Sequence, residues 1–162
     1  KNIPIVRVLV AEDKRSLNIT IKGAYRVWAL PSKQLLKNGE SLPVAMLVST
    51  ADGMKLGKEE WATRSVRMEP LEDGELFLNQ SRFRGVVDVF KDKAGFLYAI
   101  NRLNVEDYLY GVLHHEVASW WPMEALKAQA IAARTYALYQ ARVPRFTEEV
   151  PQKNSGQNVP ST

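Results

Sequence analysis

Hydrophobic and polar residues alternate along the first hundred residues of the chain. Apolar side chains, many of them β-branched or aromatic, recur at every second position in eight short stretches, and this spacing is typical of half-buried strands. The predicted strands cover residues 5–10, 17–21, 25–30, 44–48, 65–68, 75–78, 83–90 and 96–100.

Glycine-containing pairs separate these stretches. The pairs are Lys22-Gly23, Asn38-Gly39, Asp52-Gly53, Asp73-Gly74 and Ala94-Gly95. Glycine accepts a positive φ without steric cost, so such pairs favour tight chain reversals. The sequence therefore predicts hairpin-like turns between short antiparallel strands.

The apolar spacing becomes helical from residue 104 onwards. Val105, Leu109 and Val112 share one face of a predicted helix that Asn104 can cap, and Gly111 marks its expected end. A second helix is predicted from Pro122 to about residue 141, because proline suits the first position of a helix. Small and apolar residues line one face of this helix, namely Leu126, Ala130, Ala133 and Ala137. Small residues permit close packing, so we expect this helix to be central and largely buried.

These patterns predict an α+β protein with a mostly antiparallel, β-rich N-terminal portion followed by two α-helices. Residues 1–143 are expected to form one domain, since the length supports a single substantial core. Residues 144–162 are rich in proline and small polar residues and carry little apolar surface. We expect them to form a flexible polar tail.

Charge, cysteine content and hydropathy exclude several classes of partner and chemistry. The net charge is +4, but the basic residues are spread along the chain, which argues against a nucleic-acid partner. The chain has no cysteine, so disulfides and thiolate chemistry are excluded. No apolar run approaches the roughly 20 residues that span a bilayer. The first residue is Lys1 rather than methionine, so a membrane anchor is expected only through an N-terminal segment outside this sequence.

Two neighbouring motifs carry a family resemblance. Residues 104–112 read Asn-Val-Glu-Asp-Tyr-Leu-Tyr-Gly-Val, and residues 119–136 read Ser-Trp-Trp-Pro-Met-Glu-Ala-Leu-Lys-Ala-Gln-Ala-Ile-Ala-Ala-Arg-Thr-Tyr. Together they resemble the signature of the SpoIID (stage II sporulation protein D) family of peptidoglycan lytic transglycosylases. The resemblance is specific over residues 98–140. Family members continue well beyond the second helix, so the resemblance implies a short or truncated member.

Glu116 stands where this family has its catalytic glutamate, between the two motifs. We expect it on the connection between the helices, at the mouth of a groove. Trp120, Trp121 and other apolar neighbours would favour a protonated carboxyl group, which is the form that donates a proton to a glycosidic oxygen. Composition alone favours a solvated loop glutamate, and only the resemblance reverses that interpretation.

Three further residues are predicted to bind substrate. Lys127 and Arg134 are seven positions apart, which at about 100° per residue brings them within roughly 20° of the same helix face. The resemblance places both in the substrate groove, although two solvated surface charges would give the same pattern. Trp120 could stack on a sugar ring, whereas Tyr136 is expected to be structural.

A metal site is not expected. His114 and His115 are adjacent and lack the i, i+4 spacing of a helical zinc pair, and the family usually has Pro-Ser before the glutamate. No cofactor is expected either.

The resemblance implies cleavage of the MurNAc-GlcNAc β-1,4 bond, in peptide-stripped glycan strands, with formation of 1,6-anhydro-MurNAc and Glu116 as acid and base. A hydrolase of the usual kind would need a second carboxylate, for which the sequence offers no evident candidate. The alternative is a non-catalytic glycan-binding module or one that enhances an amidase. The expected partners are glycan strands and other cell-wall hydrolases such as an amidase, and the expected location is the cell envelope.

Overall fold

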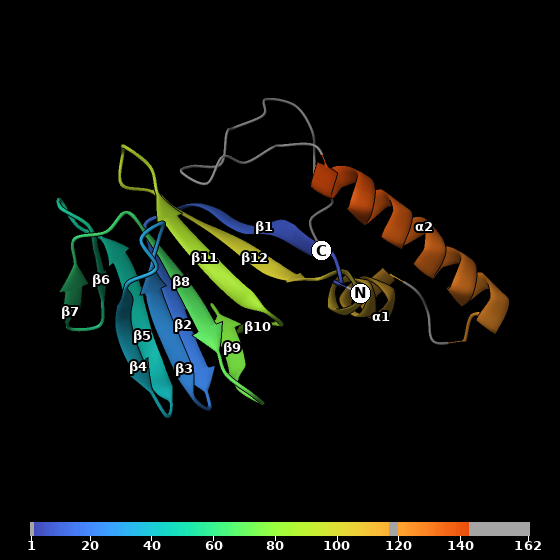
Figure 1. Ribbon diagram of the computed structural model, residues 1–162, viewed down its shortest axis with the longest axis horizontal. Helices are drawn as coiled ribbons and strands as arrows, with labels where there is room; N and C mark the ends of the chain where they lie inside the picture. Colours follow the sequence, from blue (N-terminus) through green and yellow to red (C-terminus); the bar gives the residue numbers. More distant parts are fainter. Residues whose placement is uncertain (1, 117–119, 143–162) are drawn as a thin grey trace. The chain divides into compact units, whose positions relative to one another are not determined.

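The computed structural model describes residues 2–116 and 120–142 (Figure 1). Contacts within the chain divide these residues into two units. Residues 7–102 form the first, here called the sandwich unit, and residues 2–6 with the described part of 103–142 form the second, called the helical unit. The predicted α+β class, with a mostly antiparallel β-rich portion followed by two helices, is confirmed.

Twelve strands occur in the described residues. They are β1 (Ile5–Lys14), β2 (Ser16–Lys22), β3 (Tyr25–Ala29), β4 (Leu35–Gly39), β5 (Leu42–Ser49), β6 (Met54–Leu56), β7 (Glu59–Trp61), β8 (Ser65–Pro70), β9 (Glu75–Leu78), β10 (Ser81–Phe83), β11 (Val86–Lys91) and β12 (Leu97–Asn104). They form two six-stranded sheets, one in the order β1-β12-β11-β8-β3-β4 and the other in the order β10-β9-β2-β5-β6-β7.

The core of the sandwich unit combines alternate residues from both sheets. Leu17, Ile19 and Ile21 of β2 are fully buried, as are Val66 and Met68 of β8 in the opposite sheet. This period of two is the pattern that alternation along the sequence predicted, because successive side chains of a strand point to opposite faces. Burial of these side chains between the sheets is the main stabilising contribution in this unit.

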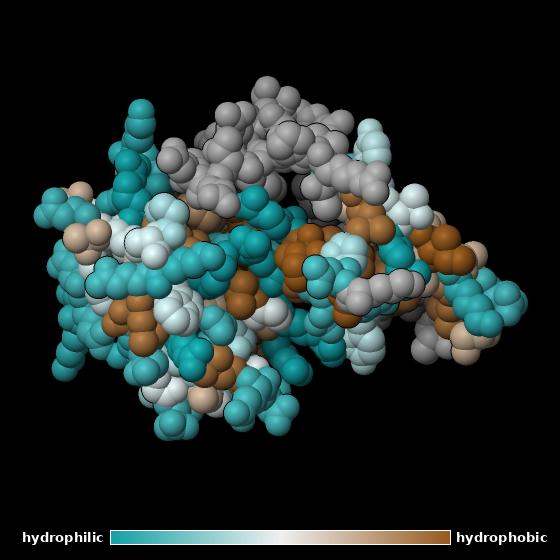
Figure 2. Space-filling view, viewed as in Figure 1, coloured by the Kyte–Doolittle hydropathy of each residue, from teal (hydrophilic) through white to brown (hydrophobic). Residues whose placement is uncertain are grey.

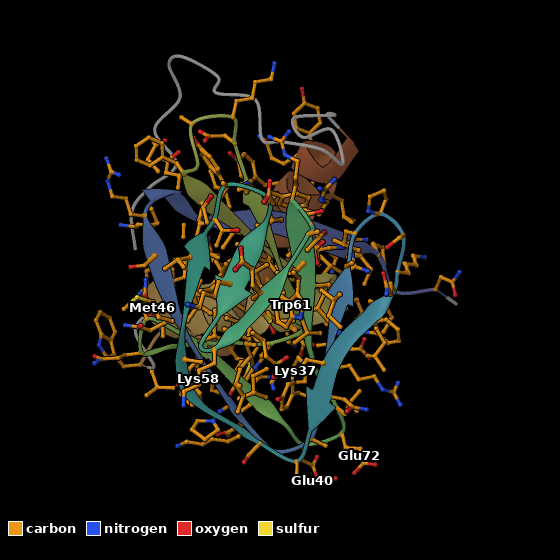
Figure 3. All side chains as sticks on the ribbon, turned by 90° about the vertical axis from the view of Figure 1, so that its left-hand side faces the viewer. Lys37, Glu40, Met46, Lys58, Trp61 and Glu72 are labelled. Carbon is orange, nitrogen blue, oxygen red and sulfur yellow. The ribbon has the colours of Figure 1, made fainter. Side chains whose placement is uncertain are left out.

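Each of the eight predicted stretches overlaps an observed strand, although the stretch 83–90 combined the last residue of β10 with β11. Three short strands were missed entirely: β4, β6 and β7. Charged residues break the alternation in two of them. Lys37 of β4 forms an ion pair with Glu59 of β7, and both strands lie at the edge of their sheet. Figure 3 looks onto this side of the sandwich, with Lys37 and Trp61 labelled. The hydrogen bond from Lys37 to Glu59 raises the pKa of the lysine.

The predicted turns fall into two groups. Gly53 and Gly95 lie in the connections of true hairpins, because β5 pairs with β6 and β11 pairs with β12, both antiparallel. The hairpin prediction is wrong at Asn38-Gly39, because Gly39 ends β4 and the following strand, β5, belongs to the other sheet. It is also wrong at Gly23 and Gly74, where the chain likewise passes from one sheet to the other. These two crossovers touch: a Cβ on Gly23, whose φ is +99°, would lie 3.0 Å from the Cα of Gly74. Glycine is therefore required at residue 23 both by conformation and by close approach.

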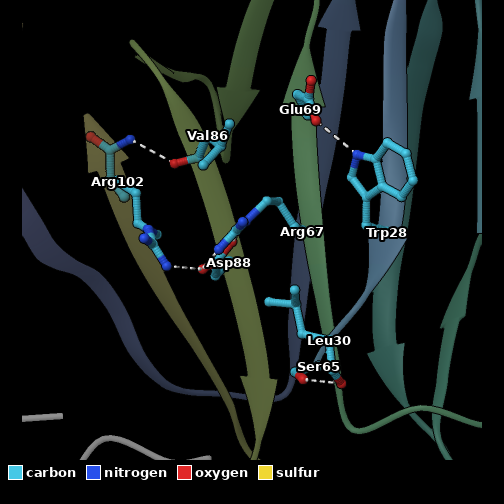
Figure 4. Close-up of polar contacts among 9 residues, drawn as sticks. Trp28, Leu30, Ser65, Arg67, Glu69, Val86, Asp88 and Arg102 are labelled. Atoms are coloured by element: carbon cyan, nitrogen blue, oxygen red, sulfur yellow. Dashed lines mark hydrogen bonds and ion pairs between the residues drawn. The ribbon is translucent and has the colours of Figure 1, made fainter. Parts of the chain in front are cut away.

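A buried ion pair links three strands of the first sheet (Figure 4). Asp88 of β11 accepts two hydrogen bonds from the guanidinium of Arg67 of β8, at 2.7 and 2.9 Å. Arg102 of β12 lies 3.7 Å from the second carboxylate oxygen. Asp88 is almost completely buried, so these partners replace the water that its charge would otherwise need.

The helical unit contains α1 (Val105–Glu116) and α2 (Met123–Arg142). Asn104 caps α1 as predicted, since its side-chain oxygen accepts a hydrogen bond of 2.8 Å from the backbone N–H of Asp107. The expected end at Gly111 is wrong, because α1 continues for five more residues, to Glu116. Glycine costs a helix only about 1 kcal/mol relative to alanine, which the neighbouring turns can offset.

The prediction that α2 is central and buried is also wrong. Ala137 is the one buried residue among positions 123–140 of this helix, and the side chains of Ile131 and Tyr136 are more than 60% exposed. An alanine-rich helix can be stable through intrinsic propensity, so its composition does not require burial. Tyr136 was accordingly misassigned as a structural core residue.

Candidate functional site

Glu116 is the last residue of α1 rather than a residue of the connection between the helices. The helix runs five residues further than the glycine signal indicated, and this extension carries Glu116, together with His114 and His115, onto the helix. The side chains of these three residues, and residues 117–119, lie outside the described part of the structure. The catalytic assignment of Glu116 therefore stays a prediction.

Arg134 connects the two helices. Its guanidinium donates a hydrogen bond of 3.0 Å to Glu106 in the first turn of α1. Both side chains are about half exposed, so the pair contributes little to the free energy of folding, but it fixes the guanidinium beside α1. The sequence did not predict this contact, because residues 28 positions apart give no local signal.

Lys127 lies about two turns before Arg134 on α2, and its partner is different. Its ammonium lies 3.2 Å from a carboxylate oxygen of Glu124, three residues earlier on the same helix. Glu124 and Lys127 are both strongly exposed, so water competes with this pair and the lysine can exchange partners easily. The two predicted groove cations therefore differ: Arg134 is held against α1, whereas Lys127 stays adaptable. Their role in substrate binding stays a prediction.

Aromatic side chains are unusually exposed in the helical unit. Trp120 is 81% exposed, and Tyr110 of α1, Tyr136 and Tyr139 of α2 each expose at least 60% of their surface. Hydrophobic residues are visible on the surface of both helices in Figure 2. Tyr139 was not identified from the sequence, although it lies one turn after Tyr136. Exposed aromatic faces can stack on the apolar faces of pyranose rings.

The described carboxylates of the helical unit are all engaged. Glu106 binds Arg134, Glu124 binds Lys127, and Asp107 accepts a hydrogen bond of 2.8 Å from the side-chain amide of Asn104. Apart from Glu116, these are the acidic residues of positions 103–142. Each has a structural partner, so none of the three stands out as the second acid of a two-carboxylate site.

Over residues 2–116 and 120–142, no cluster of three or more side chains with metal-binding groups is found. Within the same ranges, neither helix has the length and apolar content needed to cross a membrane.

Comparison with known proteins finds a family model that matches part of the chain, and relatives that match most of it. Residues 93–161 match the family model SpoIID, described as Stage II sporulation protein. An uncharacterized protein of Brachyspira hyodysenteriae is 36% identical over 138 residues, covering 85% of this chain and 37% of that protein. An uncharacterized protein of Chlamydia muridarum is 29% identical over the same length, covering 85% of this chain and 47% of that protein.

The chain thus spans less than half the length of these two relatives. No solved structure matches it significantly. The family match begins just before β12, includes both helices, and continues through most of the segment predicted to be a tail. Residues 143–161 therefore share the family pattern, although their structure lies outside the described residues. The match over residues 93–161 supports SpoIID family membership, on the same two helices that carry the sequence motifs.

Proposed function

We propose that this protein is a peptidoglycan lytic transglycosylase that cleaves the MurNAc-GlcNAc β-1,4 bond of glycan strands. The observation that carries the proposal is the SpoIID match across α1, α2 and the connection that follows Glu116. The exposed aromatic residues of the helical unit add a surface suited to sugar rings. Peptide-stripped strands are the preferred substrate in this proposal.

The proposed mechanism uses Glu116 twice. The protonated carboxyl group first donates its proton to the glycosidic oxygen, and the bond between that oxygen and C1 of MurNAc breaks. The resulting carboxylate then takes the proton of the C6 hydroxyl group while the C6 oxygen attacks C1. The products are a 1,6-anhydro-MurNAc end and a free GlcNAc hydroxyl group, and no water is consumed.

The described carboxylates of the helical unit are compatible with a mechanism that uses a single acid. A retaining or inverting hydrolase needs two carboxyl groups, about 5–10 Å apart, of which one acts on the sugar or on a water molecule. In the described structure Glu106 is paired with Arg134 and Asp107 with Asn104, whereas Glu124 forms only an exposed pair with Lys127. A reaction in which the substrate supplies its own C6 hydroxyl group needs only one acid.

In the same proposal, two cations and one aromatic residue of the helical unit bind the substrate. Arg134 and Lys127 would bind the lactyl carboxylate of MurNAc, for which charge-assisted hydrogen bonds are suited. Trp120 would stack on a sugar ring beside the reacting bond. The protein would act in the cell envelope, where its substrate lies.

A second candidate is a non-catalytic glycan-binding module that enhances another wall enzyme such as an amidase. The same exposed aromatic residues favour it, because glycan binding through them does not require Glu116. The two candidates differ only in whether a bond is cleaved.

The test is the release of saccharides that end in 1,6-anhydro-MurNAc from glycan strands without stem peptides, measured by mass spectrometry. Glu116→Gln should abolish release while glycan binding persists, because only the transferable proton is lost. Glu124→Gln is the matched control, since it makes the same change on an exposed helix residue, and it should retain activity. Undiminished cleavage by Glu116→Gln would contradict the mechanism, and glycan binding without cleavage by the wild-type protein would favour the second candidate.

A further inference from the structure

A polar concavity lies within the sandwich unit and contains none of the residues of the helical unit. Its volume is about 590 Å³, and its wall comes from the β1–β2 turn, the β5–β6 turn, the residue before β8 and the β11–β12 turn. Four cationic and two acidic residues are among those that line it: Arg15, Arg64, Lys91, Lys93, Asp52 and Asp92. The β11–β12 turn is the loop that projects beyond the sheet in Figure 1.

Lys91 is a buried cation in the wall of this concavity. It is 8% exposed, and its ammonium donates to the backbone carbonyls of Thr50 at 2.6 Å and Gly53 at 3.1 Å. No carboxylate of the described residues lies within ion-pair distance of it. An ammonium group has three N–H donors, so two carbonyls leave one donor and most of the charge for a further partner. Burying a cation in this way is costly unless a partner compensates it.

The acidic residues of the concavity do not provide that compensation. Asp92 is occupied by its own turn: one carboxylate oxygen accepts the backbone N–H groups of Ala94 and Phe96, both at 2.9 Å, and the other lies 3.2 Å from the hydroxyl group of Tyr98. Asp52 is exposed at the β5–β6 turn. Four cations against two acids leave the lining with a net positive charge.

The remaining cations are available at the surface of the concavity. The guanidinium of Arg15 lies over the ring of Phe96, 5.1 Å from its centroid, which restrains the arginine beside the β11–β12 turn. The side chains of Arg64 and Lys93 make no ion pair or hydrogen bond with any residue that the structure describes. Their donors can therefore bind a ligand without breaking an existing contact.

We propose that this concavity binds a phosphate group. A phosphate group offers several acceptor oxygens and up to two negative charges, so guanidinium and ammonium donors from different loops can bind it simultaneously. A carboxylate has two oxygens and one charge, and would satisfy only part of this lining. The buried ammonium of Lys91 supplies a fixed charge, and Arg64 and Lys93 close on the ligand from the surface. The proposal does not depend on the function proposed for the helical unit.

The experiment is a titration of the full, ¹⁵N-labelled chain with inorganic phosphate, at constant ionic strength maintained with chloride. Saturable shifts are expected for the amides of residues 50–53 and 91–96. The double variant Arg64→Gln/Lys93→Gln should weaken binding about tenfold or more, because two charge-assisted contacts are lost. The matched control is Lys55→Gln/Lys58→Gln, which removes the same charge from exposed positions of the same unit outside the concavity.

Three outcomes would overturn the proposal: shifts that do not saturate, equal weakening by the two double variants, or acetate binding as tightly as phosphate. A parallel titration with poly(glycerol phosphate) distinguishes the source of the ligand. Tighter binding of the polymer, lost in Arg64→Gln/Lys93→Gln, supports a phosphate group carried by an anionic polymer. Equal affinity per phosphate group supports a small phosphate-containing ligand in the same site.

Discussion

The sandwich unit and the helical unit differ in how many of their side chains are buried. The sandwich buries a large cluster of apolar side chains from both sheets, together with the charged residues Asp88 and Lys91. In the helical unit, buried side chains are few, and the described charged groups pair at the surface. A densely packed unit has one well-defined structure, whereas a sparsely packed one keeps apolar and charged side chains accessible to a ligand. The candidate catalytic segment belongs to the second kind.

The largest expected difference between the units is in the cost of removing an apolar side chain. Leu17→Ala in the sandwich core should lower the free energy of unfolding by about 3–4 kcal/mol, because it leaves a cavity where Leu17 is fully buried. Ile131→Ala on α2 should change it by less than about 0.5 kcal/mol, because this side chain is 61% exposed. Urea denaturation of both variants measures the contrast. A comparable loss from Ile131→Ala would mean that a further segment covers α2 in solution.

An intermediate effect on stability is expected when the buried Tyr98 of the sandwich unit is substituted. The hydroxyl group of Tyr98 donates to Asp13 at 2.6 Å, and this hydrogen bond, with burial and with Asp92, raises the pKa of the phenol well above its usual value of 10. The unfolded chain then loses this proton at lower pH than the folded chain, so stability falls as the pH rises above about 10.

Tyr98→Phe tests this linkage. The substitution should lower the free energy of unfolding by about 1–2 kcal/mol at neutral pH, because the hydrogen bond to Asp13 is lost. This difference from the wild-type protein should shrink above pH 10, where the wild-type protein loses the contribution of Tyr98 and the variant has none to lose. Denaturation midpoints between pH 8 and about 11 provide the measurement. A difference that is constant with pH would show that the phenol does not titrate differently in the two states.

The sequence predicted the sandwich better than the helical unit, for a physical reason. Alternation along a strand reports directly which face is buried, and all eight predicted stretches became strands. The misses were edge strands such as β4 and β7, where charged Lys37 and Glu59 meet across the two sheets. Which sheet a strand joins depends on long-range packing, so the crossovers at Gly23 and Gly74 could not be distinguished from hairpins.

In the helical unit, local sequence signals predicted the secondary structure but not the packing. Local signals identified both helices and the Asn104 cap, because capping depends on neighbouring residues. They overestimated the burial of α2, since alanine marks helix propensity as readily as close packing. The contact between Arg134 and Glu106 joins separate helices and has no local signature. The identity of the candidate site came from a motif resemblance, which the family match supports.

The smallest expected effect on stability concerns the two cations of α2, and it separates structure from function. Arg134→Gln should lower the free energy of unfolding by less than about 1 kcal/mol, because its ion pair with Glu106 is about half exposed. Lys127→Gln should change it even less, since Glu124 and Lys127 are more exposed still. Thermal denaturation of both variants measures these changes.

Glycan binding by the same variants should respond more strongly. If Arg134 and Lys127 bind the lactyl carboxylate, each substitution should weaken binding of peptide-stripped strands by about 1–3 kcal/mol, because a charge-assisted contact is lost. Glu106→Gln is the control for positioning: it frees the guanidinium of Arg134 from α1 but keeps its charge. If Glu106→Gln weakens binding as much as Arg134→Gln does, the position of the guanidinium matters as well as its charge. Unchanged binding in Arg134→Gln, with a clear loss of stability, would make the arginine a purely structural link between the helices.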